Sequence, residues 1–304
     1  MLLQDVEQYG NLELLARQVV EGFITGLHNS PNHGFSVEFA EHKSYSPGMN
    51  IRNIDWKLFA RSDKLFVKQF EEETNLRCRI LLDVSNSMRY PEDGNAKLKF
   101  SVLATAAICQ LLRKQRDAFG LSTFNQRLVE HGHMKSNDRH FINVLSQLDK
   151  YWTDKAPIPQ AESKEDLIQT LNYIAGNAHR RSLIILFTDM LDDESDNEDV
   201  WQALQYLKHG KNEIVLFHVR DSKTELNFEF SSREHRFEHL ESEEKLILNP
   251  GEIKEAYVKE ALAFDEMVKE KCLSYNIDYY PIDAAQDFHQ LLLTFYQKRR
   301  RMQS

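Results

Sequence analysis

An apolar run passes directly into a polar cluster at Ile80-Leu81-Leu82-Asp83-Val84-Ser85-Asn86-Ser87. The apolar residues predict a strand, and a helical pattern follows the cluster. One carboxylate and two hydroxyls are therefore spaced two residues apart at the end of a strand. Mg²⁺ prefers oxygen ligands in near-octahedral geometry and usually takes one or two carboxylates from a protein, so this spacing fits a divalent-cation site. The alternative is a strand-end turn in which Ser87 or Asn86 caps the following helix.

Strands alternate with helices along most of the chain after residue 76. The most apolar strand, 182–187, is followed by Thr188-Asp189, so Asp189 also lies at a strand end. Apolar strands that alternate with helices predict a parallel sheet covered on both faces. We therefore expect a doubly wound, mostly parallel α/β sheet. Ligands of such sheets bind beyond the carboxyl ends of the strands at the switch point, where Asp83 and Asp189 converge if their strands flank it.

The same patterns predict the elements and their grouping. The expected strands span 79–84, 119–124, 127–131, 182–187, 214–219 and 277–282, and the expected helices span 12–27, 97–115, 141–148, 167–174, 200–207, 253–272 and 288–296. We expect an N-terminal helix and β-hairpin extension over 1–76, with the hairpins between 34 and 73. An α/β domain over 77–304 then carries a β insertion near 227–249.

Composition limits the possible partners and compartments. The chain has 304 residues, of which 41% are apolar, a share that is typical of a globular protein. Its net charge of -9 disfavours nonspecific binding to nucleic acid or anionic membrane. Its three cysteines form no Cys-x-x-Cys pair, which fits a reduced compartment. The sequence contains no signal-peptide pattern and no apolar span of about 20 residues. We therefore expect a cytoplasmic protein without membrane insertion.

The two strand ends resemble a known metal site. A strand that ends in Asp-x-Ser-x-Ser and a later strand that ends in Thr-Asp are similar to the metal-ion-dependent adhesion site of a von Willebrand factor A domain. The resemblance implies that Asp83, Ser85, Ser87 and Asp189 hold a metal ion, directly or through water. The implied ion is Mg²⁺, with Mn²⁺ or Ca²⁺ as alternatives. It also implies an open coordination position that a partner's carboxylate can occupy.

Motifs upstream of the first strand narrow the resemblance. In order they are Gly34-Phe35-Ser36-Val37-Glu38-Phe39, Tyr45-Ser46-Pro47-Gly48, Ile54-Asp55-Trp56, Ala60-Arg61 and Val67-Lys68-Gln69-Phe70-Glu71-Glu72-Glu73. This succession resembles the bacterial domain-of-unknown-function family fifty-eight over nearly the whole chain. Members of that family resemble von Willebrand A proteins and are commonly linked with MoxR-type AAA+ ATPases. The resemblance therefore implies a protein partner, a MoxR-type ATPase or its client.

One departure from the adhesion-site pattern concerns a third hydroxyl ligand. The pattern expects a Thr at the start of the helix before the Thr-Asp strand, and Ser163-Lys164-Glu165-Asp166-Leu167 occupies that region. Either Ser163 replaces the Thr as a ligand, or Glu165 or Asp166 adds a carboxylate, or the site is incomplete. An extra carboxylate would favour Ca²⁺ or Mn²⁺, or would neutralise the ion and weaken its hold on an acidic partner.

Other polar groups have simpler explanations. Trp56 and Arg61 are candidates for a partner-binding surface, but we favour the simpler interpretation, in which Trp56 anchors the hairpins to the sheet and Arg61 pairs with Asp55. The histidine pairs 131/133 and 235/239 would each supply half of a transition-metal site, and neither has a third ligand in the sequence. The acidic stretch 192–199 lacks the Gly and terminal Glu of an EF-hand loop, which favours a solvated loop before a helix.

Signatures of common enzymes are missing from the sequence. It has no Gly-x-x-x-x-Gly-Lys phosphate loop, no His-Glu-x-x-His and no Gly-x-Ser-x-Gly. We therefore expect a non-enzymatic, metal-dependent protein-binding module. The alternative is a Mg²⁺-dependent phosphohydrolase with Asp83 as nucleophile and Asp189 as helper, although Ser85 stands where such enzymes carry a second Asp. A third possibility is an adaptor that binds its partner through the hairpins around Trp56.

Overall fold

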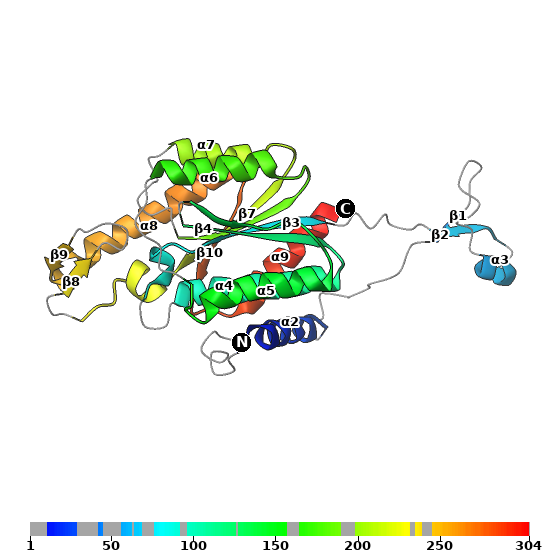
Figure 1. Cartoon of the computed structure of the whole chain (residues 1–304), viewed down its shortest axis with the longest axis horizontal. Coiled ribbons are helices and arrows are strands. Elements are labelled where there is room, and N and C mark those ends of the chain that lie inside the picture. The colour runs from blue at the N-terminus through cyan, green and yellow to red at the C-terminus, as the bar shows by residue number, and fades with distance from the viewer. Residues whose placement is uncertain are drawn as a thin grey trace.

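The fold is built on one sheet with strand order β10-β7-β6-β3-β4-β5, shown in a computed structural model (Figure 1). The structure describes residues 11–28, 42–44, 56–62, 64–68, 76–91, 96–125, 127–156, 164–189, 198–231, 235–238 and 245–303. The strands are β3 (Arg77–Asp83), β4 (Ala118–Phe124), β5 (Leu128–His131), β6 (Leu183–Thr188), β7 (Glu213–Arg220) and β10 (Asp278–Asp283). β5 runs antiparallel to β4, and the other neighbours are parallel. The predicted doubly wound, mostly parallel α/β sheet is confirmed.

The central strand β3 shows why these segments become buried strands. Ile80 and Leu82 contribute to the core on one face of the sheet, and Leu81 contributes to the core on the other. All three side chains are fully buried. A strand that is covered on both faces gains from apolar residues at every position, which explains the continuous apolar run.

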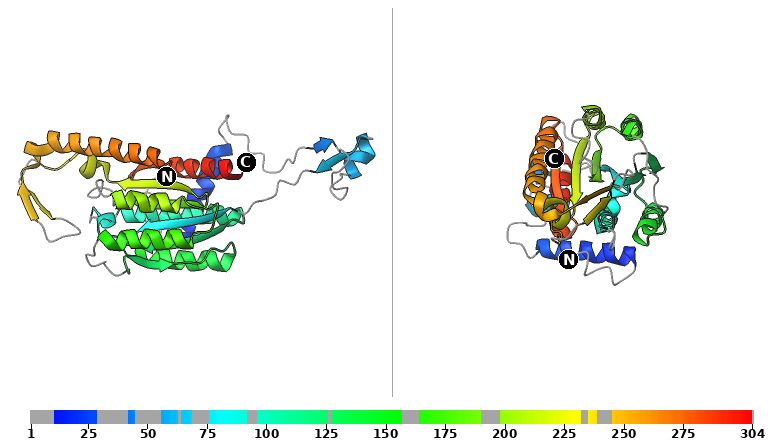
Figure 2. Two further views of the ribbon diagram at one scale, coloured as in Figure 1. Left: turned by 90° about the horizontal axis from the view of Figure 1, so that it is seen from above. Right: turned by 90° about the vertical axis from the view of Figure 1, so that its left-hand side faces the viewer.

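Helices cover both faces of the sheet (Figures 1 and 2). One face packs against α4 (Ala96–Lys114), α5 (Asp138–Trp152) and α9 (Phe288–Gln303), and α2 (Leu12–His28) packs on the outside of these helices. The other packs against α6 (Lys164–Asn177), α7 (Glu198–Leu207) and α8 (Pro250–Ser274). Among the described helices, none combines the length and the apolar character that crossing a membrane requires.

The chain changes direction across the sheet between β3 and β6. From β3 the connection through α4 leads to β4 on one side, and from β6 the connection through α7 leads to β7 on the other side. β3 and β6 are hydrogen-bonded neighbours, so they flank the switch point. Side chains at their carboxyl ends therefore meet at the position where doubly wound sheets bind ligands.

The N-terminal region agrees in part with expectation. The predicted helix is present as α2, which packs on α4 and shares the core of that face. β1 (His42–Ser44) pairs antiparallel with β2 (Phe66–Lys68), as expected for a hairpin. Between them lies a helix, α3 (Trp56–Ser62), where we expected only β structure. Its sequence contains no Gly, Pro or β-branched residue, so nothing in it opposes a helical turn.

A β excursion interrupts the alternation after β7, in the interval where the sequence predicts an insertion. A single π-helical turn, η4 (Ser222–Leu226), leads into β8 (His235–Glu238), which pairs antiparallel with β9 (Lys245–Leu248). We call β8, β9 and the N-terminal half of α8 the arm, and it projects from the sheet (Figure 2). Phe228 anchors the arm, since its ring centroid lies 4.3 Å from that of Tyr257 and 5.7 Å from that of Phe237.

Ion pairs attach the closing helix α9 to the sheet. The Nζ atom of Lys298 lies 3.0 Å from Glu213 and 2.6 Å from Asp278, at the start of β7 and β10. Arg299 Nε lies 2.6 Å from Asp117, which directly precedes β4. These contacts give the basic run at the end of the chain a structural role.

Candidate metal centre

The switch point brings together four of the predicted metal ligands. Asp83 is the last residue of β3, and Asp189 directly follows the last residue of β6. Ser85 and Ser87 lie on the loop after β3, where Ser87 begins the 3₁₀ turn η3 (Ser87–Arg89). Asp83, Ser85 and Asp189 are buried, at 1%, 6% and 3% exposure. The parallel pairing of β3 with β6 thus places two carboxylates and two hydroxyls at one edge of the sheet.

Hydrogen bonds connect these oxygens in a continuous chain. The Oγ atoms of Ser85 and Ser87 lie 3.0 Å apart, and Ser87 Oγ donates to Asp189 Oδ1 at 2.9 Å. Asp83 Oδ1 accepts from the backbone N–H of Ser85 at 2.9 Å, and its Oδ2 accepts from the Thr188 hydroxyl at 2.6 Å. Both oxygens of Asp83 are therefore held in fixed positions by donors from the two strand ends.

A buried lysine that the sequence reasoning missed completes the cluster. Lys97, in the first turn of α4, is 1% exposed, and its Nζ atom donates to Asp189 Oδ2 at 2.6 Å. Lys97 Nζ also contacts Glu225 Oε1, from η4. A cation in the first turn of a helix opposes the helix dipole, so the sequence marks Lys97 as unfavourably placed, and it marks Lys99 in the same turn equally. Glu225 lies in one isolated turn that follows no sequence period, and it gave no such signal.

Burial and like charge shift the proton equilibria of the cluster. Burial and the neighbouring Asp189 carboxylate raise the pKa of Asp83 to about 7, although hydrogen bonds from Thr188 and Ser85 oppose the shift. Burial also raises the pKa of Glu225 above its ordinary value, against the opposing effect of Lys97. Burial alone would lower the pKa of Lys97, but Asp189 and Glu225 together raise it above its ordinary value. The ammonium therefore stays charged at neutral pH.

The oxygens fit a small hard cation. Neighbouring ligands of an octahedral Mg²⁺ ion with bonds of about 2.1 Å are about 3.0 Å apart, and the hydrogen-bonded pairs Ser85 Oγ–Ser87 Oγ, at 3.0 Å, and Ser87 Oγ–Asp189 Oδ1, at 2.9 Å, have this spacing. These three atoms would hold the ion, with Asp83 contributing directly or through water. Within the described ranges, no group of three or more His, Cys, Asp or Glu side chains is placed to hold a metal ion, so a site here depends on the serine hydroxyls.

The capping alternative for this loop is wrong for Asn86. Asn86 stands at the N-cap position of η3, but its side chain makes no capping hydrogen bond there. The hydroxyl of Ser87 contacts Ser85 and Asp189, and α4 begins only at Ala96. The hydroxyls of Ser85 and Ser87 therefore face each other, and that of Ser87 also faces the end of β6.

The remaining candidates are only partly described. Ser163 lies outside the described residues, as do the side chains of Glu165 and Asp166. Replacement of the missing Thr ligand by one of these residues therefore stays a prediction. Trp56 begins α3, but its side chain lies outside the described part of the chain, whereas Arg61 in the same helix is exposed. Their role in partner binding also stays a prediction.

The histidine and acidic candidates can be placed in part. Nδ1 of His131 lies 3.0 Å from Ser122 Oγ, and burial, with the neighbouring Arg79, lowers the pKa of His131 to about 4. Glu198 and Asp199 form the first turn of α7, as expected for acids at a helix N-terminus. The rest of the acidic stretch, 192–197, and His239 lie outside the described residues.

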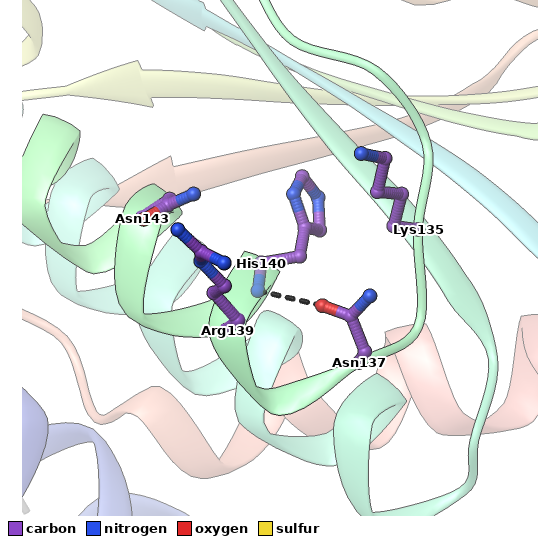
Figure 3. A pocket seen from close by; sticks show the side chains of 5 residues that line it. All are labelled: Lys135, Asn137, Arg139, His140 and Asn143. Carbon is purple, nitrogen blue, oxygen red and sulfur yellow. Dashed lines mark hydrogen bonds between the residues drawn. The ribbon is translucent and has the colours of Figure 1, made fainter.

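A separate pocket of about 430 Å³ lies at the opposite end of β4 (Figure 3). It is lined by Lys135, Asn137, Arg139, His140 and Asn143. Asn137 caps α5 by accepting a hydrogen bond from the backbone N–H of His140 at 2.8 Å, and His140 Nε2 donates to the carbonyl oxygen of Phe119 at 2.8 Å. Phe119 lies near the start of β4, whereas Asp83 pairs with Phe124 at its end, so the pocket is not part of the metal centre.

Solved structures to which this chain is similar share little sequence with it. The conserved hypothetical protein BatB from Bacteroides thetaiotaomicron is 13% identical, with 75% of this chain and 98% of that chain covered and a TM-score of 0.46. An aerotolerance-related membrane protein from Bacteroides fragilis is also 13% identical, with 73% and 99% covered and a TM-score of 0.43. A von Willebrand factor type A protein from Catenulispora acidiphila is 14% identical, with 48% and 34% covered and a TM-score of 0.37.

Sequence comparison gives a clearer assignment. Uncharacterized proteins from Mycobacterium bovis and Mycobacterium tuberculosis are 25% identical over 214 residues, which is 70% of this chain and 64% of each relative. The chain therefore matches somewhat less than two thirds of the length of these relatives. The family described as protein of unknown function DUF58 matches residues 41–263, which is most of the chain and includes Asp83, Ser85, Ser87 and Asp189. The chain belongs to the DUF58 family.

Proposed function

We propose that this protein is a non-enzymatic, metal-dependent protein-binding module. The observation that carries the proposal is the convergence of Asp83, Ser85, Ser87 and Asp189 at the switch point of the sheet. Mg²⁺ held by two hydroxyls and one carboxylate keeps open positions, which water or a carboxylate from a partner fills. The partner that the family resemblance suggests is a MoxR-type AAA+ ATPase or its client.

The state of Asp83 supports binding over phosphotransfer. A nucleophilic carboxylate needs a free oxygen within reach of a phosphorus atom. Asp83 is 1% exposed, and both of its oxygens accept hydrogen bonds, from the Ser85 N–H and the Thr188 hydroxyl. This arrangement suits a residue that fixes the geometry of a binding site.

The test is metal-dependent binding to a purified MoxR-type ATPase from the same organism. The full chain is immobilised, and ATPase binding is measured in Mg²⁺ and in EDTA for the wild type and for Asp83→Ala. We expect binding in Mg²⁺ that both EDTA and the substitution abolish. Lys135→Met, at the opposite end of β4, is the matched control and should bind like the wild type. Binding that survives both EDTA and Asp83→Ala would contradict the proposal.

A phosphoester assay separates the two chemical classes. The purified chain is incubated with Mg²⁺ and p-nitrophenyl phosphate, and release of nitrophenol is followed for the wild type and Asp83→Ala. The binding module should show no turnover that the substitution removes. Turnover that depends on both Mg²⁺ and Asp83 would instead support a phosphohydrolase.

A further inference from the structure

Lys97 places a cation inside a cluster that is suited to bind one. Its ammonium is 1% exposed and lies between Asp189 Oδ2, at 2.6 Å, and Glu225 Oε1. A buried lysine is expensive to desolvate, so its presence beside a candidate ion site calls for an explanation beyond packing. Lys97 is the second member of the first turn of α4, so its backbone position is fixed by the helix.

Asp189 is shared between the serines and the ammonium. Its Oδ1 accepts from Ser87, on the side where the hydroxyls would hold an ion, and its Oδ2 accepts from Lys97. An ion on Oδ1 and the ammonium on Oδ2 would be separated by only one carboxylate group. At about 5 Å, two positive charges in a partly desolvated site repel strongly.

Glu225 holds the ammonium in place from the other side. Its Oε1 contacts Lys97, and its Oε2 accepts the backbone N–H of Asp221 at 2.6 Å. Asp221 in turn caps η4 by accepting the Thr224 N–H at 2.9 Å. Lys97 therefore has a dedicated carboxylate and does not depend on Asp189 alone.

The charges of the cluster balance for one divalent ion. When ionised, Asp83, Asp189 and Glu225 contribute three negative charges and Lys97 contributes one positive charge, which leaves a net charge of minus two. One Mg²⁺ or Mn²⁺ ion brings this sum to zero. Without Lys97, the same cluster would carry minus three, which one trivalent ion balances.

We propose that Lys97 determines which ions the site accepts, because its ammonium permanently occupies the position beside Asp189 Oδ2 that a second cation would otherwise take. It limits the site to one divalent ion, lowers the affinity for that ion, and discriminates against ions of higher charge. This inference rests on the proposed metal site and specifies its selectivity.

The test measures Mn²⁺ and Tb³⁺ binding to the full chain by titration calorimetry at constant pH and ionic strength. We expect Lys97→Met to bind Mn²⁺ at least tenfold more tightly than the wild type, because the repulsive charge is gone. The ratio of Tb³⁺ to Mn²⁺ affinity should also rise at least tenfold, since a trivalent ion gains more from the lost repulsion. Lys99→Met is the matched control, because Lys99 lies in the same helix and its Nζ lies 3.8 Å from Asp154. Its affinities should stay within twofold of the wild type.

A second variant changes the charge in the opposite direction. Glu225→Gln removes a negative charge and leaves Lys97 beside Asp189, so Mn²⁺ binding should weaken at least tenfold. The double variant Lys97→Met with Glu225→Gln restores a net charge of minus two, and its Mn²⁺ affinity should return to within about fivefold of the wild type. Glu225→Gln keeps the proposal testable if Lys97→Met alone does not fold.

The outcomes separate this inference from the proposed metal site. If the wild type binds Mn²⁺ but Lys97→Met binds it equally or more weakly, Lys97 does not set the selectivity and the metal site stands. An unchanged Mn²⁺ affinity in Glu225→Gln would equally overturn the inference. If neither the wild type nor any variant binds Mn²⁺, the metal site itself fails and this inference fails with it.

Discussion

The metal centre at the carboxyl ends of β3 and β6 and the pocket near the amino end of β4 hold polar groups of very different construction. At the carboxyl ends of β3 and β6, Asp83, Lys97 and Asp189 are at most 3% exposed and carry opposite charges. At the amino end of β4, Lys135 and Arg139 are exposed and carry charge of one sign (Figure 3). Buried charges must be paired, whereas exposed ones are solvated and screened. A change of one charge should therefore be costly at the metal centre and nearly neutral at the exposed residues of the pocket.

The largest expected effect is the loss of the buried ammonium. Lys97→Met leaves Asp189 and Glu225 without their shared counter-ion, and breaking a buried pair in this way costs about 3–5 kcal/mol of unfolding free energy. The measurement is urea denaturation at pH 7 in EDTA. Lys135→Met, the matched substitution in the pocket, should cost less than about 0.5 kcal/mol. A cost below about 1 kcal/mol for Lys97→Met would contradict the expected difference in stability cost between the metal centre and the pocket.

The pH dependence of the unfolding free energy should reveal the raised pKa of Asp83. Its pKa is raised to about 7 in the folded protein and is close to 4 in the unfolded chain, so the folded form holds a proton that the unfolded chain has lost. The stability that Asp83 contributes is therefore complete below about pH 4 and is lost as the pH rises towards 7. In EDTA, the stability difference between pH 5 and pH 8 should be about 3 kcal/mol smaller in Asp83→Asn than in the wild type. Equal differences in the two proteins would contradict the raised pKa.

A smaller effect is expected at Ser87. Ser87→Ala removes the hydroxyl that contacts Ser85 Oγ and donates to Asp189 Oδ1, which should cost about 1 kcal/mol in EDTA. The same substitution removes a proposed ion ligand, so the rise in melting temperature that Mn²⁺ gives the wild type should shrink markedly. Thermal melts with and without Mn²⁺ measure both effects. An unchanged Mn²⁺ response would exclude Ser87 as a ligand.

The smallest effect is expected at the pocket. Arg139→Ala should change the unfolding free energy by less than about 0.5 kcal/mol, because the side chain is exposed and the cap of α5 comes from Asn137. Its Mn²⁺ affinity should equal that of the wild type. Urea denaturation and calorimetry check the two statements, and a loss above about 1 kcal/mol would show that the pocket is also a structural centre.

Much of the fold follows from local patterns in the sequence. The apolar strands and the helices between them appear close to their predicted bounds, because each strand is buried on both faces and needs an apolar run. The meeting of Asp83 and Asp189 was predicted on the condition that β3 and β6 flank the switch point, which the strand order confirms. Local sequence was therefore sufficient to predict the strands and helices, and the switch-point rule for parallel sheets was sufficient to predict that Asp83 and Asp189 meet.

Other features depend on contacts that no local pattern encodes. The partner of Lys97 on η4, Glu225, is 128 positions away, and its place depends on one π-helical turn. The sequence marks Lys97 as an unusual residue for the start of a helix, but it does not indicate which carboxylate pairs with it. The helix α3 was missed because aromatic residues beside short β-like segments suggested hairpins, while the absence of helix breakers in 56–62 allows a helix.

The strand order also has a consequence for biosynthesis. β3 lies at the centre of the sheet, yet β6 and β7 are made much later, and the contact of Asp83 with Thr188 spans 105 positions. On the ribosome, the early half of the chain presents an unsatisfied strand edge and unpaired charges until residue 225 has emerged, a state that is prone to aggregation. An ion that binds the completed cluster would therefore stabilise only chains whose synthesis has passed this point, and its uptake would report that β3, β6 and η4 have come together.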